Sequence, residues 1–449
     1  MVSPAGRDRR RPRRPTGSIQ PGSTCVSRAL LEELQWRGLV HQSSGAEALA
    51  EHLEAGRRTL YCGFDPTADS LHIGSLVPLL TLRRFQLAGH RPVALVGGAT
   101  GLIGDPSFKA AERSLNEREV VATWVERIRA QVGRFVELEG EAGLVVDNLD
   151  WTGDMDVVHF LRDVGKHFSV NEMVRKESVR ARLEREGSGL SYTEFSYLLL
   201  QSYDYVELAR RHDCTLQIGG SDQWGNITAG MDLCRRMLGR QVHALTLPLV
   251  TRADGAKFGK TEAGTVWLDA RRTSPYSFYQ FWVNTADADV GRFLRYFTFL
   301  TRGEIEALEA SLAEAPERRE AQRALAREVT RAVHGEAGLA SAERITDALF
   351  SAKLDALAGE DLAQLELDGV PSAVAADRSM RIGEALVGVG LAKSNSAAMQ
   401  LVRSGAVSVN GATVAEPGAE LASFPLLPGS YLLLRRGKRH WGLVRLAVA

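Results

Sequence analysis

Apolar segments of strand length alternate with helix-length segments in the first part of the chain. Apolar runs typical of buried strands cover residues 57–64, 91–98 and 143–151. Between them, residues 69–89 and 117–138 place apolar side chains at helical spacing. This alternation predicts parallel strands with helices on both faces of one sheet. The fold class that follows is α/β, with a Rossmann-like parallel-sheet domain.

The pattern changes further along and divides the chain. Residues 155–210 are mostly helical in pattern, 214–233 fit a strand, a tight turn and a helix, and 275–350 are rich in helix-forming residues. We expect a disordered basic tail, a Rossmann-like catalytic domain with a helical insertion, an α-helical domain, a linker and a small α+β domain. Their expected boundaries, in that order, are 1–26, 27–262, 263–350, 351–377 and 378–449.

Charge is balanced overall, with 55 Lys and Arg against 55 Asp and Glu, but it is unevenly distributed. Residues 1–26 hold six Arg and one Asp, and residues 371–449 hold nine basic and four acidic side chains, so each segment carries +5. Residues 27–370 carry −10. This asymmetry indicates a basic module joined to an acidic body and is compatible with a nucleic-acid partner.

Composition argues against several classes of protein. A hydrophobic fraction of 44% and a charged fraction of 24% are ordinary for a globular chain. No charge-free window of about 18 apolar residues occurs, so no membrane span is expected. The four cysteines form no C-x-x-C pair, which argues against a zinc ribbon and fits a reducing cytoplasm. The Arg-rich start precedes no apolar stretch, so no secretory signal is expected, and we predict a cytoplasmic protein.

Polar clusters follow four of the apolar segments. They are Tyr61–Ser75, Gly97–Ser107, Gln217–Asn226 and Lys257–Thr261. In an open parallel sheet, ligands bind at the carboxyl ends of strands, where loops meet helix N-termini. Four such loops therefore outline one candidate site better than any single motif does.

Each motif taken alone also has a purely structural interpretation. His72 and Gly74 fit the opening turns of a helix, where free amides meet phosphate, but a capping His beside a packing glycine has the same pattern. Lys257 and Lys260 could stabilise charge on a polyphosphate or could form an exposed turn. The GGATGLIGDPS segment matches neither a Walker loop nor G-x-G-x-x-G, which removes support for a nicotinamide cofactor. It leaves Asp105 as a carboxylate able to hold an amino group.

Five motifs, in order and spacing, resemble the bacterial tyrosyl-tRNA synthetases, a family of class I aminoacyl-tRNA synthetases. They are YCGFDPTADSLHIGS, GGATGLIGDPS, SYTEFSYLLLQSYD, QIGGSDQWGN and KFGKT. The resemblance implies a ligase that activates L-tyrosine with ATP to tyrosyl-adenylate and pyrophosphate, then transfers tyrosyl to the 3′-terminal adenosine of its tRNA. It also implies a homodimer, Mg²⁺ accompanying the ATP and no fixed protein-bound metal.

The resemblance assigns roles residue by residue. The implied tyrosine-binding residues are Tyr61, Asp65, Asp105, Tyr197, Gln201, Asp204 and Gln217. The residues implied to border ATP or the adenylate are Cys62, Gly63, Gly74, Ser75, Lys109, Arg113, Gly219, Asp222 and Gln223. The catalytic set implied to face the phosphates is Thr67, His72, Lys257, Lys260 and Thr261. An acceptor and a donor at Asp204 and Tyr61 would suit discrimination against phenylalanine, which lacks the phenol hydroxyl.

Two signatures depart from the family pattern. The HIGH signature reads HIGS here, with Ser75 in place of the second His, and KMSKS reads KFGKT, which keeps both lysines and a terminal hydroxyl. We expect activity to survive both changes. The chemistry needs no general base, because the tyrosine carboxylate is already a nucleophile, so positioning and phosphate stabilisation dominate.

The C-terminal segment 380–414 resembles the small RNA-binding module of the ribosomal S-four type. Residues 394–404 fit a helix, and Asn410-Gly411 predicts a two-residue hairpin turn. The basic side chains expected to bind tRNA are Lys393, Arg403, Arg435, Arg436, Lys438 and Arg439. A solvated charged hairpin would produce the same local pattern.

Three alternatives remain at this point. A non-catalytic RNA-binding protein on a synthetase scaffold would be favoured by loss of the KFGKT lysines, His72 or Asp105, and all are present. A different RNA-modifying enzyme with the same C-terminal module would not need nucleotide loops at strand ends. A tryptophan-specific relative would lack the pair Tyr61 and Asp204.

Overall fold

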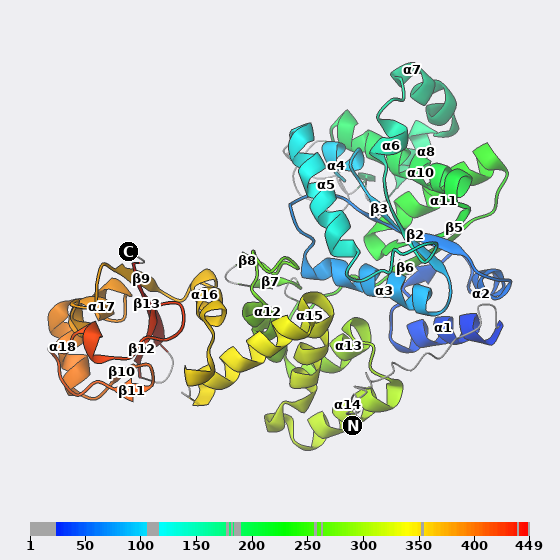
Figure 1. Ribbon diagram of the computed structural model, residues 1–449. Helices are drawn as coiled ribbons and strands as arrows, with labels where there is room; N and C mark the ends of the chain where they lie inside the picture. Colours follow the sequence, from blue (N-terminus) through cyan, green and yellow to red (C-terminus); the bar gives the residue numbers. More distant parts are fainter. Residues whose placement is uncertain are drawn as a thin grey trace, which may run out of the picture.

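A six-stranded sheet forms the centre of the first domain (Figure 1). Its strands are β1 (Gln42–Ser43), β2 (Thr59–Phe64), β3 (Arg91–Val96), β4 (Leu144–Asp147), β5 (Cys214–Gly220) and β6 (His243–Leu247). They lie in the order β1-β6-β5-β2-β3-β4, with β1 antiparallel to β6 and the other neighbours parallel. The predicted parallel sheet is therefore confirmed. This computed structural model describes residues 24–105, 116–176, 179–180, 183, 190–255, 258–261, 264–351, 354–437 and 440–447.

Helices cover both faces of this sheet. One layer consists of α1 (Thr24–Trp36), α2 (Ala46–Glu54), α3 (Leu76–Leu87) and α5 (Arg118–Val132), and the other of α10 (Tyr192–His212) and α11 (Trp224–Leu238). Leu60 and Cys62 of β2 pack with the first layer, whereas Tyr61 packs with the second, as the alternation of side chains along a strand requires. Short helices in the connections are α4 (Thr100–Ile103), α6 (Leu149–Thr152), α7 (Val157–His159) and α8 (Val170–Arg175).

The start of α3 differs from the helix expected over 69–89. Only a 3₁₀ turn, Ile73–Ser75, precedes Leu76, and His72 is its N-cap. Residues before the turn are extended because they pair with a later segment: Ile73 N donates to Val266 O at 3.0 Å, and Leu268 N donates to Leu71 O at 2.9 Å. A tertiary pairing therefore replaces the first turns of the helix.

A helical domain follows the sheet domain. It contains α12 (Pro275–Val283), α13 (Asp287–Phe297), α14 (Arg302–Glu314) and α15 (Glu320–Ser351). Gly335 interrupts α15 with φ 72°, a conformation that glycine adopts readily. A small hairpin of β7 (Lys260–Thr261) and β8 (Gly264–Thr265) joins this domain to the sheet domain. None of the helices in the described part of the chain is long and apolar enough to cross a membrane.

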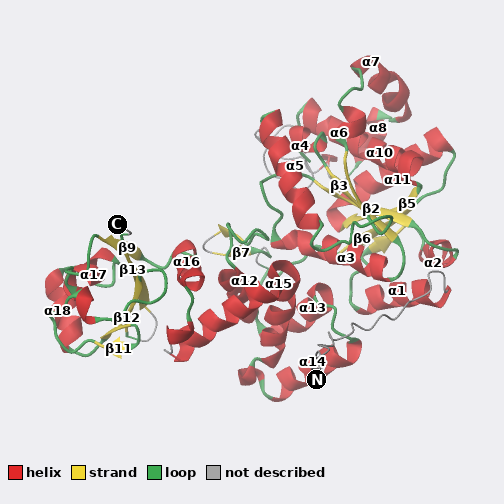
Figure 2. Cartoon of the chain, in the orientation of Figure 1, coloured by secondary structure: helices red, strands yellow, loops and turns green. Residues whose placement is uncertain are grey.

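The C-terminal domain is a five-stranded sheet with two helices on it (Figure 2). Its strands are β9 (Ser372–Ala375), β10 (Val407–Val409), β11 (Ala412–Thr413), β12 (Tyr431–Arg436) and β13 (His440–Leu446), and its helices are α17 (Ile382–Gly388) and α18 (Asn395–Arg403). Residues 394–404 form α18 with its two caps, as expected. Asn410 and Gly411 both have positive φ, 47° and 84°, which fits the predicted hairpin turn.

The expectation of an irregular linker over 351–377 is wrong. This segment contains α16 (Gly359–Leu367), and β9 is the parallel edge strand beside β13. Leu362 and Leu365 are buried in one cluster with Leu433 and Leu443 of the C-terminal sheet. The small residues of β9 gave no strand pattern, because its pairing with β13 depends on residues about seventy positions later.

Candidate active site

A cavity of about 580 Å³ lies at the carboxyl ends of β2, β3, β5 and β6. The residues expected at the site that line it are Tyr61, Cys62, Gly63, Asp65, Thr67, His72, Gly74, Ser75, Asp105, Tyr197, Gln201, Asp204, Gln217, Gly219, Asp222 and Gln223. Lys109, Arg113 and Lys257 lie outside the described residues. Only the backbone of Lys260 and Thr261 is described, in β7. The fold therefore gathers four separate strand-end clusters around one cavity.

The innermost part of the cavity combines a buried carboxyl with a buried phenol. Asp204, 2% exposed, accepts hydrogen bonds from Asn148 Nδ2 at 3.0 Å and Trp151 Nε1 at 2.9 Å. Burial raises the pKa of Asp204 to about 8, although these two hydrogen bonds act in the opposite direction. The hydroxyl of Tyr61 is buried and has no hydrogen-bond partner among the described residues. Both groups can therefore interact with a hydroxyl that enters the cavity.

A second group of hydrogen bonds surrounds Asp65. Tyr197 Oη donates to Asp65 Oδ2 at 2.7 Å, and Thr100 Oγ1 donates to Asp65 Oδ1 at 2.7 Å. Thr100 Oγ1 in turn accepts from Asn148 Nδ2 at 3.0 Å. Gly97 is required beside them, because a Cβ at that position would collide with Asp65 and Thr100. Asn148 therefore joins the Asp65 group to Asp204.

Amide side chains line the next part of the cavity. Gln223 Nε2 donates to Asp105 Oδ2 at 2.9 Å, and Gln201 Nε2 approaches Gln223 Oε1 at 3.3 Å. Asn226 Nδ2 donates to Gln201 Oε1 at 2.8 Å. Burial also raises the pKa of Asp222 above its ordinary value. This region offers carboxylate and amide oxygens, which suit a bound ammonium group.

Backbone groups dominate the outer end of the cavity. His72 Nδ1 accepts from Gly74 N at 3.0 Å, and Ser75 follows at the start of α3. Gly259 has φ 77°, and a Cβ there would collide with Ile73. The KFGKT turn and the HIGS segment therefore approach each other at a point where only glycine fits.

Phe258 anchors the KFGKT turn in the helical domain. Its ring stacks on Phe297 with centroids 5.4 Å apart and meets Phe293 and Phe281 edge-on at 5.1 and 5.8 Å. Aromatic contacts of this kind add to the stabilisation from apolar burial. One end of the turn is thus fixed in an aromatic core.

The structure adds residues that the sequence analysis did not select. Thr100, Asn148 and Trp151 support the buried carboxyls, Asn226 supports Gln201, and Phe258 anchors the turn. The polar pair Asp147 and Asn148 inside the apolar segment 143–151 was the available signal, because it marks the end of β4 and the start of another strand-end loop.

The basic residues expected in the C-terminal domain differ in their surroundings. Lys393 and Arg403 are exposed. Arg435 lies over the ring of Trp441, 5.1 Å from its centroid, and Arg436 Nη1 donates to Leu391 O at 2.6 Å. Lys438 and Arg439 lie outside the described residues. Arg436 therefore also has a structural contact within the domain.

Comparison with known proteins agrees with this architecture. A family model described as "tRNA synthetases class I (W and Y)" matches residues 54–351, and one described as "Tyrosine--tRNA ligase SYY-like C-terminal domain" matches residues 361–444. The first defines the class of the sheet and helical domains. The second begins within α16, which agrees with the packing of that helix on the C-terminal sheet.

Similar full-length proteins narrow the class further. A tyrosine–tRNA ligase of Aliivibrio fischeri is 62% identical over 416 residues, 92% of this chain and 98% of that protein. One from Chromobacterium violaceum is 58% identical over 417 residues, 93% and 98% of the two chains. A mitochondrial tyrosyl-tRNA synthetase of Aspergillus nidulans superposes with a TM-score of 0.64 at 28% identity, covering 74% and 95%. The chain belongs to the tyrosine–tRNA ligase family of class I aminoacyl-tRNA synthetases.

Proposed function

We propose that this chain binds tyrosine with its phenol at the Tyr61–Asp204 end of the cavity and joins it to ATP at the outer end. Tyrosine–tRNA ligation is the activity that family membership supports. The observation that carries the orientation is the buried Tyr61 hydroxyl, which has no hydrogen-bond partner in the described part of the chain and lines the cavity together with the carboxyl of Asp204. Tyrosine supplies one hydroxyl that can accept from Tyr61 and donate to Asp204.

Selectivity against phenylalanine follows from the same two groups. Phenylalanine would bury them and leave both without the hydrogen bonds that tyrosine makes, at a cost of about 1–3 kcal/mol for each neutral group. The tyrosyl-tRNA synthetases are the known example of rejection by this principle. No second, editing site is needed for this distinction.

The ammonium group of tyrosine would lie near Asp105, Tyr197 and Gln201, with Asp65 and Gln217 completing the pocket. Asp105 and Gln201 line the cavity and are joined through Gln223. The ammonium would displace or bridge the amide contacts of Gln223, because it offers three donors to these oxygens. This places the carboxylate toward the glycine-rich outer end.

Adenylate formation would then take place at the outer end of the cavity. The tyrosine carboxylate attacks the α-phosphorus of ATP, the bond to the β-phosphate oxygen breaks, and pyrophosphate leaves with the electron pair. We assign Thr67, His72, Lys257, Lys260 and Thr261 to the phosphates, with Lys109 and Arg113 beside pyrophosphate. Cys62, Gly63, Gly219, Asp222 and Gln223 would border the adenosine part, together with Gly74 and Ser75. Mg²⁺ would accompany the ATP phosphates.

The C-terminal domain would supply the tRNA-binding surface, with the helical domain as a second contact. The domain carries an excess of basic residues, and Lys393 and Arg403 are exposed on and beside α18. Cationic side chains bind the RNA backbone mainly through phosphates, so binding should weaken as salt increases. Transfer of the tyrosyl group would give tRNA with tyrosine esterified to its 3′-terminal adenosine, and would release AMP.

We place the protein in the cytoplasm.

A homodimer would cover an apolar surface in the insertion between β4 and β5. Exposed large apolar side chains concentrate there: Val157 (68%), Val158 (68%), Leu161 (49%), Val170 (63%), Leu183 (55%) and Tyr192 (72%). Such a concentration is typical of a protein interface. Val158→Asp should give monomers in sedimentation velocity, and an unchanged dimer would contradict this assignment.

The deciding test is tyrosine-dependent exchange of pyrophosphate into ATP by the full chain. We expect exchange with tyrosine and very little with phenylalanine at equal concentration. Equal exchange with both amino acids would contradict the assigned orientation. Absence of exchange with tyrosine would contradict the proposed chemistry.

A further inference from the structure

The segment that carries His72 and the segment that leaves the KFGKT turn form one backbone ladder. His72 and Trp267 are bridge partners in an antiparallel pairing. Val266 N donates to Gly259 O at 2.9 Å, while Val266 O accepts from Ile73 N at 3.0 Å. A shift of residues 266–268 would therefore move both signatures.

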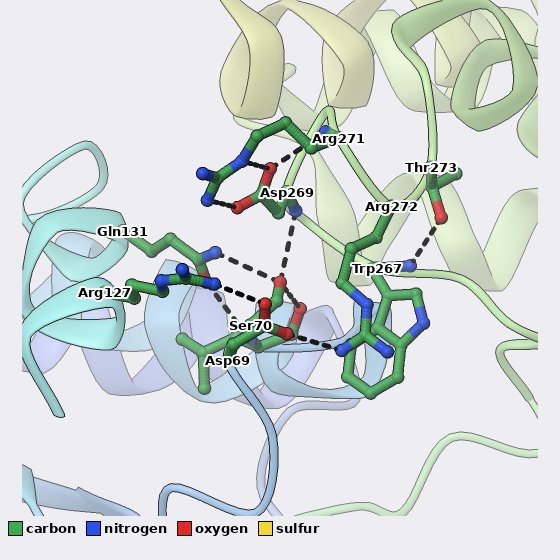
Figure 3. Close-up of polar contacts among 10 residues, drawn as sticks. Asp69, Ser70, Arg127, Gln131, Trp267, Asp269, Arg271, Arg272 and Thr273 are labelled. Carbon is green, nitrogen blue, oxygen red and sulfur yellow. Dashed lines mark hydrogen bonds and ion pairs between the residues drawn. The ribbon is translucent and has the colours of Figure 1, made fainter. Parts of the chain in front are cut away.

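Polar side chains fasten the base of this ladder (Figure 3). Ser70 Oγ accepts from Gln131 Nε2 at 3.0 Å and from Asp269 N at 3.2 Å. Gln131 Oε1 accepts from Leu71 N at 2.9 Å. Ser70 and Gln131 are almost fully buried, so these hydrogen bonds are protected from water.

Asp69 joins three segments at the rim of the same junction. Its Oδ1 accepts from Arg272 Nη1 at 2.7 Å, and its Oδ2 accepts from Arg127 Nη1 at 2.5 Å. Arg127 belongs to α5, and Arg272 follows the ladder. Asp69 precedes His72 by only three residues, so its ion pairs restrain the chain immediately before the HIGS segment.

Arg272, which pairs with Asp69, also contacts Trp267. Its guanidinium lies over the indole, 3.8 Å from the ring centroid, and Thr273 Oγ1 accepts from Trp267 N at 3.0 Å. The ring of Trp267 meets that of His72 at 64°, with centroids 6.5 Å apart. Side-chain contacts therefore join Asp69 to Arg272, Arg272 to Trp267, and Trp267 to His72. The backbone between residues 69 and 72 connects the two ends of this series.

We propose that Asp69 and Arg272 are positioning residues for adenylate formation. They hold Trp267 and the ladder in place. This fixes the position of His72 relative to the KFGKT turn, so that both can contact the phosphates of ATP at the same time. Neither residue lines the cavity, so both act through other residues. The inference rests on the proposed phosphate roles of His72 and the turn. Its effect falls on the rate of the chemical step, because small displacements of positioned groups reduce rate more than ground-state binding.

Arg272→Ala tests this role against a matched neighbour. Arg271→Ala is the control, because Arg271 also forms an ion pair, with Asp269 at 2.5 Å, but its side chain is 69% exposed. We expect Arg272→Ala to lower kcat for tyrosine-dependent pyrophosphate exchange about 10- to 100-fold and to change the Kd for tyrosine less than about twofold. Arg271→Ala should stay within about twofold of the unmodified chain in both quantities.

Two further variants separate positioning from folding. Arg272→Lys keeps the charge beside Asp69 but loses the planar stack on Trp267, so it should recover part of the rate. The double variant Asp69→Asn with Arg272→Ala should lose less rate than the product of the two single losses, because each single variant already breaks the shared Asp69–Arg272 contact.

Three results would overturn the inference. One is an exchange rate for Arg272→Ala equal to that of Arg271→Ala. Another is a loss of tyrosine affinity in proportion to the rate, which would indicate general damage. The third is full additivity in the double variant. Failure of the unmodified chain to exchange pyrophosphate would instead overturn the proposed function, so the two failures are distinguishable.

Discussion

The two ends of the cavity are built in different ways. At the inner end, Asp204 and Tyr197 of α10 are 2% and 5% exposed. Asp204 accepts hydrogen bonds from Asn148 in the β4–α6 connection and from Trp151 of α6, and Tyr197 donates to Asp65, which follows β2. At the outer end, His72 is exposed, and the KFGKT turn approaches it through a glycine. The inner end is a closed network of side chains, whereas the outer end depends on backbone pairing.

This difference matches the two tasks proposed for the site. Recognition of a hydroxyl requires fixed, desolvated groups, since a mobile or hydrated partner would be satisfied without the ligand. Phosphate chemistry instead benefits from groups that act as charge develops on the leaving group. Substitutions at the outer end should therefore change rates, and substitutions at the inner end should change affinity and stability.

Lys260→Ala should give the largest effect and tests the outer end. We expect the rate of adenylate formation to fall by about 10²- to 10³-fold, because the change removes the cation that we propose to stabilise the developing charge. The Kd for tyrosine should change by less than about twofold. Single-turnover adenylate formation and equilibrium tyrosine binding measure the two quantities. Equal losses in both would show that the turn contributes to ground-state binding, and the contrast between the ends would fail.

Asn148→Ala should give the next largest effect and tests the inner end. Asn148 donates to Asp204 and Thr100 and accepts from Ala99 N at 2.7 Å, all within the protein interior. Its loss should lower the free energy of unfolding by about 2–3 kcal/mol and weaken tyrosine binding. Denaturant titration and tyrosine binding measure this. Asn284→Ala is the control, because Asn284 makes an exposed bond to Gln280 O, and an equal loss there would contradict the network.

The inner end should also make tyrosine binding depend on pH, with a smaller effect than the two substitutions above. Burial raises the pKa of Asp204 to about 8 from 3.8, so the carboxyl of the free site is largely protonated at neutral pH. If the phenol donates to the carboxylate, binding releases a proton. As the pH rises from 6, the Kd for tyrosine should then fall by up to about tenfold per pH unit, and it should level off above pH 8.

Isothermal titration in buffers of different ionisation enthalpy counts the released protons. An invariant Kd between pH 6 and 8, with no proton release, would show that tyrosine binds the protonated carboxyl.

The raised pKa of Asp204 also affects the stability of the fold. The stabilisation from Asp204 is present below its unfolded pKa of 3.8 and is lost as the pH rises toward 8, because the folded state binds the extra proton.

The sheet and most of the cavity could be predicted from the sequence. Asp65 directly follows β2, Tyr61 and Gln217 lie within β2 and β5, and parallel strands carry their carboxyl ends to one edge. Local patterns suffice for such positions because strand direction determines where they lie. Their chemical roles came from the family resemblance and remain proposals.

Features that depend on long-range contacts could not be predicted in this way. Phe258 looked like a variation within a signature, and its anchoring role depends on Phe293 and Phe297 of α13. The extended segment before α3 depends on residues 266–268, and β9 depends on β13. In each case the partner lies far along the chain, so the local pattern contains no sign of it.

Tyr61→Phe should give the smallest effect on the free protein and the sharpest test of the inner end. Its hydroxyl is buried without a partner among the described residues, so removing it should leave the free energy of unfolding unchanged or raise it by up to about 1 kcal/mol. The same change should reduce the preference for tyrosine over phenylalanine by about tenfold, because one of two groups aimed at the phenol is lost.

Tyr205→Phe is the matched control for this prediction. Tyr205 meets Tyr61 edge-on with centroids 5.1 Å apart, but its hydroxyl already donates to His243 O at 2.7 Å. It should therefore lower the free energy of unfolding by about 1–2 kcal/mol and leave the amino-acid preference unchanged. Denaturant titration and exchange assays with both amino acids separate the two variants. If Tyr61→Phe instead loses stability and keeps full selectivity, the Tyr61 hydroxyl serves the fold, and the hydroxyl of the substrate is recognised by Asp204 alone.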